Sequence, residues 1–512
     1  MVATKSYLCL FAHYNPNRVV YAATFHYIEA LTKVGVRVVF ISNSEIITDS
    51  RRKLLAFVKA DDIYIRENKG NDFGAWSWWF KKYSDDYEFD NLILTNDSLF
   101  GPVKPLKPIL LHFEGLDFDW WGLCESNSPI KHVQSFFLCF SKLVVHSDGF
   151  KRVLMQDFDR MTRDEIIKNG ELLLSKALFD AGFRYDVYCK IDTARFDPAF
   201  IESRNPTHFF WIELINSCGF PFIKKDLILK NPENLLSVGD LFEVLEESCA
   251  TSKDEMVEWL HEQYMFKDGS ISSVASEVNV LCHLFFPHFL FRFLFELNDL
   301  RAAGASFLFN VAGAIKNSKG HVALLRRLFA KSIIISCPDK GRDIGAKLAL
   351  LELRKVVGFD GKYIFFCHDK LSLHSPDAAR WRDRLMSTIK MPEMVKAIET
   401  LAADDKVGAV APVEYLRRLE YDNIAESNAF YLRKLMEKYH MGQSSGLFVA
   451  GSIFLSKAII WENFLQKHSA MECRSVLESG NVDDSYGGTF THAWERLFGC
   501  IIYDSGYKLN GI

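Results

Sequence analysis

The stretch "RENKGNDFGAW", from Arg66 to Trp76, is the key to this chain because a close copy, "CPDKGRDIGAK", returns at Cys337 to Lys347. Both copies follow a short apolar run and share the pattern Lys-Gly-x-Asp-x-Gly. Repeated motifs in matching surroundings indicate that a chain contains one structural unit twice. We therefore predict a duplicated fold.

The segments around the two stretches follow one another in the same order. "SYLCLFAHYNP" and "VNVLCHLFFP" are predicted strands ending at His13 and His283, and each precedes an amphipathic, glycine-terminated helix and a second strand. His13 stands 56 residues before Lys69, and His283 stands 57 residues before Lys340. So small a difference in spacing favours two copies of one strand–helix unit.

Strands that alternate with helices predict a parallel sheet covered on both faces, so the fold class is α/β. A length of 512 residues allows about three domains. We predict a first domain over residues 1–232, an acidic helical connector over 233–274 and a second domain over 275–512.

The composition narrows the function classes. A net charge of −4 with mixed charges argues against a broad nucleic-acid-binding surface. Eleven cysteines without a C-x-x-C pair predict free thiols in a reducing compartment. The N-terminus lacks a signal-peptide pattern, and charged residues, His and Pro interrupt the apolar stretch from Val280. We expect a cytoplasmic protein whose membrane contact, if any, is peripheral.

The repeated motif has the residue types of a phosphate and sugar site. Ligands of open α/β sheets bind beyond the carboxyl ends of the strands, where both motifs are predicted. Glycine admits a close backbone approach or positive φ, lysine supplies charge for phosphate, and aspartate accepts hydroxyl groups. A tight turn with a surface Lys–Asp pair is the alternative. The predicted nucleotide-sugar-binding residues are Lys69, Gly70, Asp72, Gly74, Lys340, Gly341, Asp343 and Gly345, with His13 and His283.

A polar triplet, Asn96-Asp97-Ser98, follows the predicted strand "NLILT". Such a triplet suits a donor diphosphate and a divalent ion, because Mg²⁺ and Mn²⁺ prefer oxygen ligands. Asp97 is a single carboxylate, so metal-dependent and metal-independent binding both stay open, as does a simple turn. The second copy carries His368, Asp369 and Lys370 there, a more cationic set that suits a diphosphate without a metal.

Aromatic and polar side chains alternate after the triplet, from "DFDWW" to "HVQSFF". Sugar sites use aromatic faces for stacking and polar groups for hydroxyls, although both tryptophans could instead belong to the core. The predicted acceptor-binding residues are Trp121, His132, Gln134 and Ser135, and Glu125 or Asp119 is the predicted base in this half.

The second half offers its own candidates near its end. Asp484 or Glu495 is the predicted base there. His492 and Glu495 lie three residues apart, so they share a helix face and His492 would bind the acceptor; a satisfied helix pair is the alternative.

The chain resembles the rhamnan synthesis protein F family, in "RENKGNDFGAW", "LILTNDSLFGPVKPL", "DFDWWGLCES", "HVQSFFLCFSK" and "NPTHFFWIELINSCGFPFIKKDL", and later in "PDKGRDIGA", "AGSIFLSKA" and "THAWERLFG". The resemblance implies two tandem GT-A-like, Rossmann-like domains. It also implies transfer of a sugar, typically L-rhamnose from dTDP-L-rhamnose, to a lipid-linked glycan of an O-antigen or lipopolysaccharide at the inner face of the membrane. The family's His-Thr-Lys-Lys-Ser is His-Asp-Lys-Leu-Ser here from His368, and its Asp-Gly-Thr is spread over "DDSYGGTF".

Three functions therefore compete. The first is a glycosyltransferase in which lysines, backbone amides or a metal ion stabilise the leaving diphosphate. In the second, one or both copies bind nucleotide-sugar or glycan without catalysis inside a polysaccharide assembly complex. A phosphate-transferring enzyme is the third, and the absence of a P-loop sequence lowers it.

Overall fold

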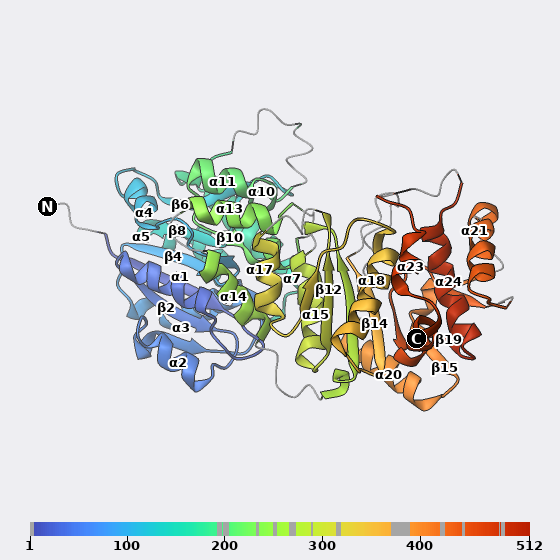
Figure 1. The fold of residues 1–512 in the computed structure, drawn as a ribbon. Coiled ribbons are helices and arrows are strands. Elements are labelled where there is room, and N and C mark those ends of the chain that lie inside the picture. The colour runs from blue at the N-terminus through green and yellow to red at the C-terminus, as the bar shows by residue number, and fades with distance from the viewer. Residues whose placement is uncertain are drawn as a thin grey trace. The chain divides into compact units, whose positions relative to one another are not determined.

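The fold was analysed in a computed structural model (Figure 1). It describes residues 5–191, 197, 204–231, 235–248, 253–265, 273–287, 290–313, 319–369, 390–419, 425–442, 446–480, 482 and 487–512. The chain forms two compact units: Met1–Leu236 with Asp240–Phe266, and Ser237–Gly239 with Lys267–Ile512. Helix α14 (Lys253–Met265), inside the predicted connector, belongs to the first unit and packs on α1 (Ala22–Lys33).

The first unit is built on a sheet with the strand order β3-β2-β1-β4-β8-β6-β7, and β9 also pairs with β6. The first four strands in this order are parallel, whereas β8 runs antiparallel to both of its neighbours. The strands are β1 (Tyr7–His13), β2 (Val36–Ser42), β3 (Ile63–Ile65), β4 (Asn91–Asn96), β6 (Trp120–Ser126), β7 (His132–Val133), β8 (Phe137–Ser141) and β9 (Tyr185–Cys189). A separate pair joins β5 (Leu99–Phe100) to β10 (Ile223–Lys224).

Helices cover both faces of this sheet. On one face Phe73, Trp76 and Trp79 of α3 (Asn71–Tyr83) pack with Leu8 and Leu10 of β1 in a cluster of buried apolar side chains. On the other face Tyr27 of α1 meets Phe11 edge to face at 5.2 Å. The remaining helices are α2 (Thr48–Leu54), α4 (Lys107–Glu114), α5 (Lys142–Val145), α6 (Asp148–Leu154), α7 (Arg163–Ile166), α8 (Leu173–Asp180), α10 (Pro206–Phe209), α11 (Trp211–Cys218), α12 (Lys225–Leu229) and α13 (Val238–Ser248), with α3 at Asn71–Tyr83.

The second unit has a sheet of the order β13-β12-β11-β14-β18-β15-β19, again with four parallel strands followed by an antiparallel β18. Its strands are β11 (Val278–Leu284), β12 (Ser306–Val311), β13 (Ile333–Ile335), β14 (Tyr363–His368), β15 (Val407–Ala411), β18 (Phe454–Lys457) and β19 (Lys508–Gly511), and β16 (Leu416–Arg418) pairs with β17 (Leu447–Val449). Its helices are α15 (Leu290–Ala302), α17 (Lys319–Leu328), α18 (Arg342–Val357), α20 (Met391–Ala403), α21 (Ala425–Lys438), α22 (Ala458–Lys467), α23 (Ala470–Ser475) and α24 (Phe490–Asp504).

The two copies of the Lys-Gly-x-Asp-x-Gly motif have the same backbone. Gly70 and Gly341 both have positive φ, 68° and 71°, and each immediately precedes a helix, α3 or α18. The next residues, Asn71 and Arg342, both have φ of 49°. The duplicated motif is therefore a turn that begins a helix, and its positive φ favours glycine at positions 70 and 341.

The strand register corrects one predicted equivalence. In the first sheet Ala12 pairs with Asn96, and in the second sheet His283 pairs with His368. His283 therefore stands at the position of Ala12, and β11 ends one residue later, at Leu284. Leu284 stands 56 residues before Lys340, the same separation as from His13 to Lys69, so the one-residue difference in the predicted spacing disappears.

Within the described part of the chain, every helix is too short or too polar to cross a membrane.

Candidate functional site

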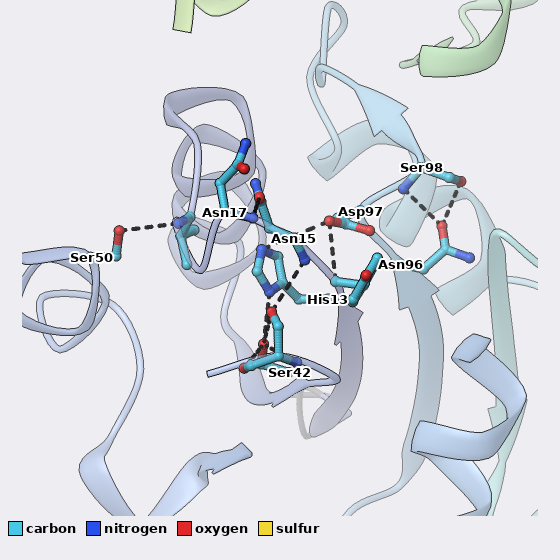
Figure 2. Close-up of polar contacts among 11 residues, drawn as sticks. His13, Asn15, Asn17, Ser42, Ser50, Asn96, Asp97 and Ser98 are labelled. Carbon is cyan, nitrogen blue, oxygen red and sulfur yellow. Dashed lines mark hydrogen bonds and ion pairs between the residues drawn. The ribbon is translucent and has the colours of Figure 1, made fainter. Parts of the chain in front are cut away.

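The carboxyl ends of β1, β2 and β4 meet at one edge of the first sheet, because these strands are parallel and adjacent. This edge brings together three of the predicted residues, His13, Asn96 and Asp97, with Ser42 at the end of β2 (Figure 2). A ligand-binding edge of this kind was expected from the strand and motif order.

His13 is buried at this edge, with 2% of its surface exposed. Its Nδ1 lies 3.0 Å from Oγ of Ser42, and its Nε2 lies 3.9 Å from Oδ2 of Asp97. Burial lowers the pKa of His13 to about 4, against a smaller opposing effect of Asp97. His13 is therefore neutral at physiological pH and offers hydrogen bonds rather than a positive charge.

Asp97 keeps a partly free carboxylate. Its side chain is 22% exposed, and its Oδ2 accepts a long hydrogen bond, 3.5 Å, from the backbone N–H of Tyr14. Its own N–H donates to the carbonyl of Ala12 at 3.1 Å, which fixes the residue against the end of β1. Among the described residues, Oδ1 of Asp97 has no hydrogen-bond partner, so this atom can meet a ligand.

Asp72 has a different role from the hydroxyl acceptor that the sequence predicted. Its Oδ1 accepts from the backbone N–H of Phe73 at 2.9 Å, and its Oδ2 accepts from the amide of Asn96 at 2.7 Å. The Oδ1 of Asn96 in turn accepts from N–H and Oγ of Ser98, at 3.1 and 2.6 Å (Figure 2). Asp72 therefore orients the triplet through Asn96.

Protein backbone lies close to the motif glycines of the first unit. A Cβ on Gly74 would lie 2.4 Å from the carbonyl oxygen of Lys69, and one on Gly70 would meet the backbone of Phe158 at 2.9 Å. The ammonium of Lys69 pairs on the surface with Glu67 at 2.5 Å, and its side chain is 56% exposed. The first copy of the motif thus builds the start of α3 beside the site.

The segment before β8 supplies buried polar groups at the same edge. Gln134 and Ser135 are 7% and 8% exposed. Nε2 of Gln134 donates to Asn205 at 3.2 Å, while its Oε1 is buried without a hydrogen-bond partner among the described residues. The N–H of Ser135 donates to Glu171 at 2.8 Å, and Nε2 of buried His132 lies 3.9 Å from the same carboxylate.

Trp121 does not provide the predicted stacking face. It is 5% exposed and its ring stacks on Phe113, with centroids 4.2 Å apart and planes 9° apart. Trp120 is 1% exposed, so both tryptophans belong to the core. The two tryptophans point to opposite faces of a strand that is buried on both faces. The sequence alone does not distinguish such a strand from one with a single buried face.

The two carboxylates predicted as bases lie at opposite ends of β6. Glu125 is near its carboxyl end, where its Oε2 accepts from Tyr185 at 3.2 Å and lies 3.6 Å from the ammonium of Lys131. Asp119 precedes the strand and accepts from the N–H of Arg184 at 2.7 Å. Asp119 therefore lies at the amino end of the sheet, away from Asp97, and Glu125 stays the predicted base.

Two lysines at this edge were missed by the sequence reasoning. Lys224 is the last residue of β10, and Lys225 begins α12. The N–H of Lys225 donates to the carbonyl of Ser98 at 2.9 Å, which ties the pair to the polar triplet. The available signal was a Lys-Lys pair directly after the apolar run "FPFI".

A surface cavity of about 730 Å³ lies elsewhere on the first unit. Arg184, Tyr185, Phe118 and Lys131 contribute to its lining. Tyr185 and Lys131 also contact Glu125, so the predicted base lies beside this cavity, whose lining shares no residue with the cluster around Asp97.

In the second unit the corresponding edge is occupied by a lysine of the protein itself. Lys347 of α18 is fully buried, and its ammonium donates to Oδ2 of Asp343 at 2.8 Å and to the carbonyl of Ser452 at 2.8 Å. It also lies 3.2 Å from Nδ1 of His368. Trp76 stands at the matching position of the first copy, so the lysine is a feature of the second copy of the motif.

Asp369 is also closed in. It is 3% exposed, and its carboxylate accepts from the N–H groups of Phe285 at 2.8 Å and Phe286 at 2.6 Å. Burial raises the pKa of Asp369 well above its ordinary value. His283 is buried with Nδ1 3.0 Å from the amide of Asn310, and burial lowers its pKa to about 4.

The motif glycines and the late carboxylates of the second unit hold loops. A Cβ on Gly345 would lie 1.9 Å from the carbonyl oxygen of Lys340, and the N–H of Gly341 donates to the backbone carbonyl of Glu478 at 2.7 Å. Oε1 of Glu495 accepts from the N–H of Gly451 at 2.5 Å. Nδ1 of His492 lies 2.6 Å from Oγ1 of Thr489, the cap of α24. The predicted sites Lys370 and Asp484 lie outside the described residues.

The protein alone does not offer a complete set of metal ligands in the part that the structure describes. No three His, Cys, Asp or Glu side chains there come together around a common point. At Asp97 a divalent ion would need most of its oxygen ligands from a bound diphosphate.

With this geometry in place, comparison with known proteins assigns the family. A family profile described as rhamnan synthesis protein F matches residues 38–507. The chain belongs to the rhamnan synthesis protein F family. This result confirms the resemblance drawn from the sequence.

Curated relatives match this chain over part of its length. The virulence protein VirA of Vibrio anguillarum (strain ATCC 68554 / 775) is 30% identical over 202 residues, which cover 34% of this chain and 64% of VirA. WxcX of Xanthomonas campestris pv. campestris (strain B100) is 28% identical over 179 residues, covering 34% of this chain and 24% of WxcX. The chain thus spans less than two thirds of the curated relatives it matches.

Among solved structures, the glycosyltransferase GlyE of Streptococcus pneumoniae TIGR4 is 14% identical, with a TM-score of 0.27 over 74% of this chain and 90% of GlyE. S. aureus TarS 1-349 in complex with UDP-GlcNAc is 10% identical, with a TM-score of 0.22 over 58% of this chain and 89% of that one.

Proposed function

We propose that the protein is a glycosyltransferase that moves a sugar from a nucleotide-activated donor onto a growing cell-surface polysaccharide. The observation that carries this proposal is the cluster at the carboxyl edge of the first sheet, in a member of the rhamnan synthesis protein F family. There a partly free carboxylate, Asp97, lies beside the buried neutral His13 and the Lys224–Lys225 pair.

The family supports a finer version of the proposal. The donor is dTDP-L-rhamnose, and the acceptor is a lipid-linked glycan of the O-antigen or lipopolysaccharide type. The enzyme acts in the cytoplasm at the inner face of the membrane, which it contacts peripherally through the lipid carrier. Each unit is a GT-A-like domain.

In this reaction the acceptor hydroxyl attacks the anomeric carbon, and the bond from that carbon to the diphosphate breaks. The electron pair leaves with the diphosphate oxygen, and the acceptor proton passes to a carboxylate. Glu125 is the proposed base, while Asp97 faces the donor and Asn96 is oriented for it by Asp72. Stabilising the charge on the leaving diphosphate is the main catalytic requirement.

A divalent ion is a further proposal. Asp97 would hold Mg²⁺ or Mn²⁺, because both ions prefer oxygen ligands, and the ion would offset negative charge on the leaving diphosphate. Loss of turnover in EDTA, and its recovery with either ion, would support this; unchanged turnover would assign the charge to protein side chains alone.

For the second unit a specific observation favours another function, binding without catalysis. Lys347 already satisfies Asp343 and contacts His368 inside the protein, so these side chains are occupied without any ligand. We infer that this unit positions a glycan or a partner for the first.

The test is a screen of the purified chain against dTDP-, UDP- and GDP-sugars, with a lipid extract containing lipid-linked oligosaccharide as acceptor. Release of nucleoside diphosphate and transfer of labelled sugar into the lipid fraction are measured together. We expect Asp97→Asn to lower turnover by roughly 100-fold or more, as the loss of a group at the reacting centre does.

Two variants complete the design. Asp85→Asn removes an exposed carboxylate and should leave turnover unchanged. Asp343→Asn tests the second unit and should leave turnover per folded molecule unchanged. Transfer with none of the donors, or equal transfer by the parent and Asp97→Asn, would remove this site from the mechanism.

A further inference from the structure

The lysine pair has a fixed position beside the polar triplet. Lys224 pairs with Leu99 in the two-stranded β5–β10 sheet, and Ile223 pairs with Phe100. With the backbone bond from Lys225 to Ser98, this ladder attaches both lysines to the segment that carries Asp97. The two side chains thus belong to the rim of the candidate site.

Both lysines are half-buried, and each ammonium lies near an aromatic ring. Nζ of Lys224 lies 4.0 Å from the centre of the Phe136 ring, and Nζ of Lys225 lies 5.6 Å from that of Phe100. Among the described residues neither ammonium makes a hydrogen bond or an ion pair. Partly desolvated cations without such partners are costly, so natural proteins keep them where a ligand completes them.

The pKa values of the two lysines reflect both their burial and the carboxylates near them. Burial lowers the pKa of Lys224 to about 8, and Glu171 and Asp72 oppose this effect. Burial also lowers the pKa of Lys225, and Asp97 opposes it. The carboxylates of Glu171, Asp72 and Asp97 are therefore close enough to influence the pair electrostatically, although none of them forms an ion pair with either lysine among the described residues.

A second observation points to a ligand with hydroxyl groups in the same region. Phe136, the ring under Lys224, follows Gln134 and Ser135 in the chain. The Oε1 of Gln134 is buried and unpartnered within the described residues, so it is an acceptor that awaits a donor. Two free cations for phosphate and one free acceptor for a hydroxyl match a nucleotide-sugar.

We propose that Lys224 and Lys225 bind the diphosphate of the nucleotide-sugar donor and stabilise it as it leaves. The inference rests on the proposed function and deepens it, because it names the groups that take the charge of the leaving group. When the bond between the anomeric carbon and the diphosphate oxygen breaks, the electron pair stays on that oxygen. The two ammonium groups offset the new charge and donate hydrogen bonds without giving up a proton.

The experiment measures the affinity of the full chain for dTDP, UDP and GDP by isothermal titration calorimetry, without any sugar acceptor. For the best of the three ligands, Lys224→Met and Lys225→Met should each weaken binding roughly 10- to 100-fold, the usual effect of losing a charged hydrogen bond. The matching arginine variants should retain most of the affinity because they keep the charge.

The matched control is Lys230→Met. Lys230 ends the same short helix, but it is 63% exposed and pairs with Asp226 at 2.9 Å. Its replacement should leave binding unchanged. The methionine variants should fold, because replacing an unpaired half-buried ammonium with an apolar group of similar size is neutral or stabilising; thermal melts check this.

The outcomes separate the inference from the proposed function. Tight diphosphate binding that depends on both lysines, without sugar transfer, would keep the diphosphate site and overturn the proposed function together with the leaving-group role of the lysines. Sugar transfer with lysine variants that bind and turn over like the parent would overturn the inference alone. If the parent binds none of the three nucleoside diphosphates, the inference is overturned too.

Discussion

Lys347 and Asp343 form an ion pair of 2.8 Å one turn apart on α18, with the lysine fully buried. The matching aspartate of the first unit, Asp72, instead accepts from the neutral amide of Asn96 at 2.7 Å. The same backbone motif thus places a lysine ammonium against the aspartate in one unit and a neutral amide against it in the other. We therefore expect a buried ion pair to contribute to stability at this position of the second unit and not at the matching position of the first.

The buried pair predicts a large loss of stability on Lys347→Met. Asp343 and the carbonyl of Ser452 would lose their cationic partner, and breaking a buried ion pair on one side costs about 3–5 kcal/mol. Chemical denaturation followed by circular dichroism measures this change in the free energy of unfolding.

Two further variants test the cause. Lys347→Met with Asp343→Asn should recover part of the loss, because the stranded charge is gone. Lys355→Met, at an exposed position on the same helix, should stay within about 0.5 kcal/mol of the parent. An equal effect of Lys355→Met and Lys347→Met would contradict the role assigned to the pair.

The duplicated glycines predict matching steric effects. Gly74→Ala and Gly345→Ala would place a Cβ 2.4 and 1.9 Å from the carbonyl oxygens of Lys69 and Lys340, so backbone must move. We expect each to cost about 1–3 kcal/mol or more in thermal or chemical melts. Gly115→Ala is the control, because a Cβ there meets nothing within 4 Å. A neutral Gly345→Ala would mean that the turn relaxes freely.

The sequence predicts part of the fold and part of the candidate site. The duplication, the strand–helix order and the position of Asp97 at a strand end follow from local patterns, which the sequence displays directly. The role of Asp72 does not, because its partner Asn96 is 24 residues away in the chain and adjacent only after β4 is in the sheet. The motif's glycines were predicted to let a ligand approach the backbone closely, and the close neighbour that the structure shows at Gly70, Gly74 and Gly345 is protein backbone.

The lysine pair illustrates the other limit. Lys224 and Lys225 lie more than 120 residues from Asp97, and a short strand pairing with β5 brings them there. Two-residue strands carry no periodicity, so no sequence pattern announces that contact. Trp121 was misjudged for a related reason, since its burial depends on α4 packing behind it through Phe113.

His13 predicts a loss of stability in acid. Its pKa is lowered to about 4 by burial, whereas an unfolded histidine titrates near 6.5. Between these values the unfolded state binds a proton that the native state does not, so stability is complete above pH 6.5 and falls as the pH drops toward 4. Relative to His13→Asn, the parent should lose roughly 3 kcal/mol over this range.

The measurement is urea denaturation of both proteins from pH 7 to pH 4. His146→Asn, at an exposed position, should parallel the parent throughout. A constant difference between the parent and His13→Asn at every pH would show that the histidine is not held neutral.

Lys224 predicts a pH limit on diphosphate binding. Burial lowers its pKa to about 8, so the ammonium loses its proton as the pH rises through that value and the diphosphate loses a cation. The affinity of the parent for the best of dTDP, UDP and GDP should therefore fall, by about tenfold near pH 9 at constant ionic strength. Lys224→Arg should hold its affinity over the same range, because a guanidinium stays charged. Titrations from pH 6.5 to 9.5 compare the two, with Lys230→Arg as the variant expected to follow the parent. Parallel curves for the parent and Lys224→Arg would assign the alkaline loss to another group.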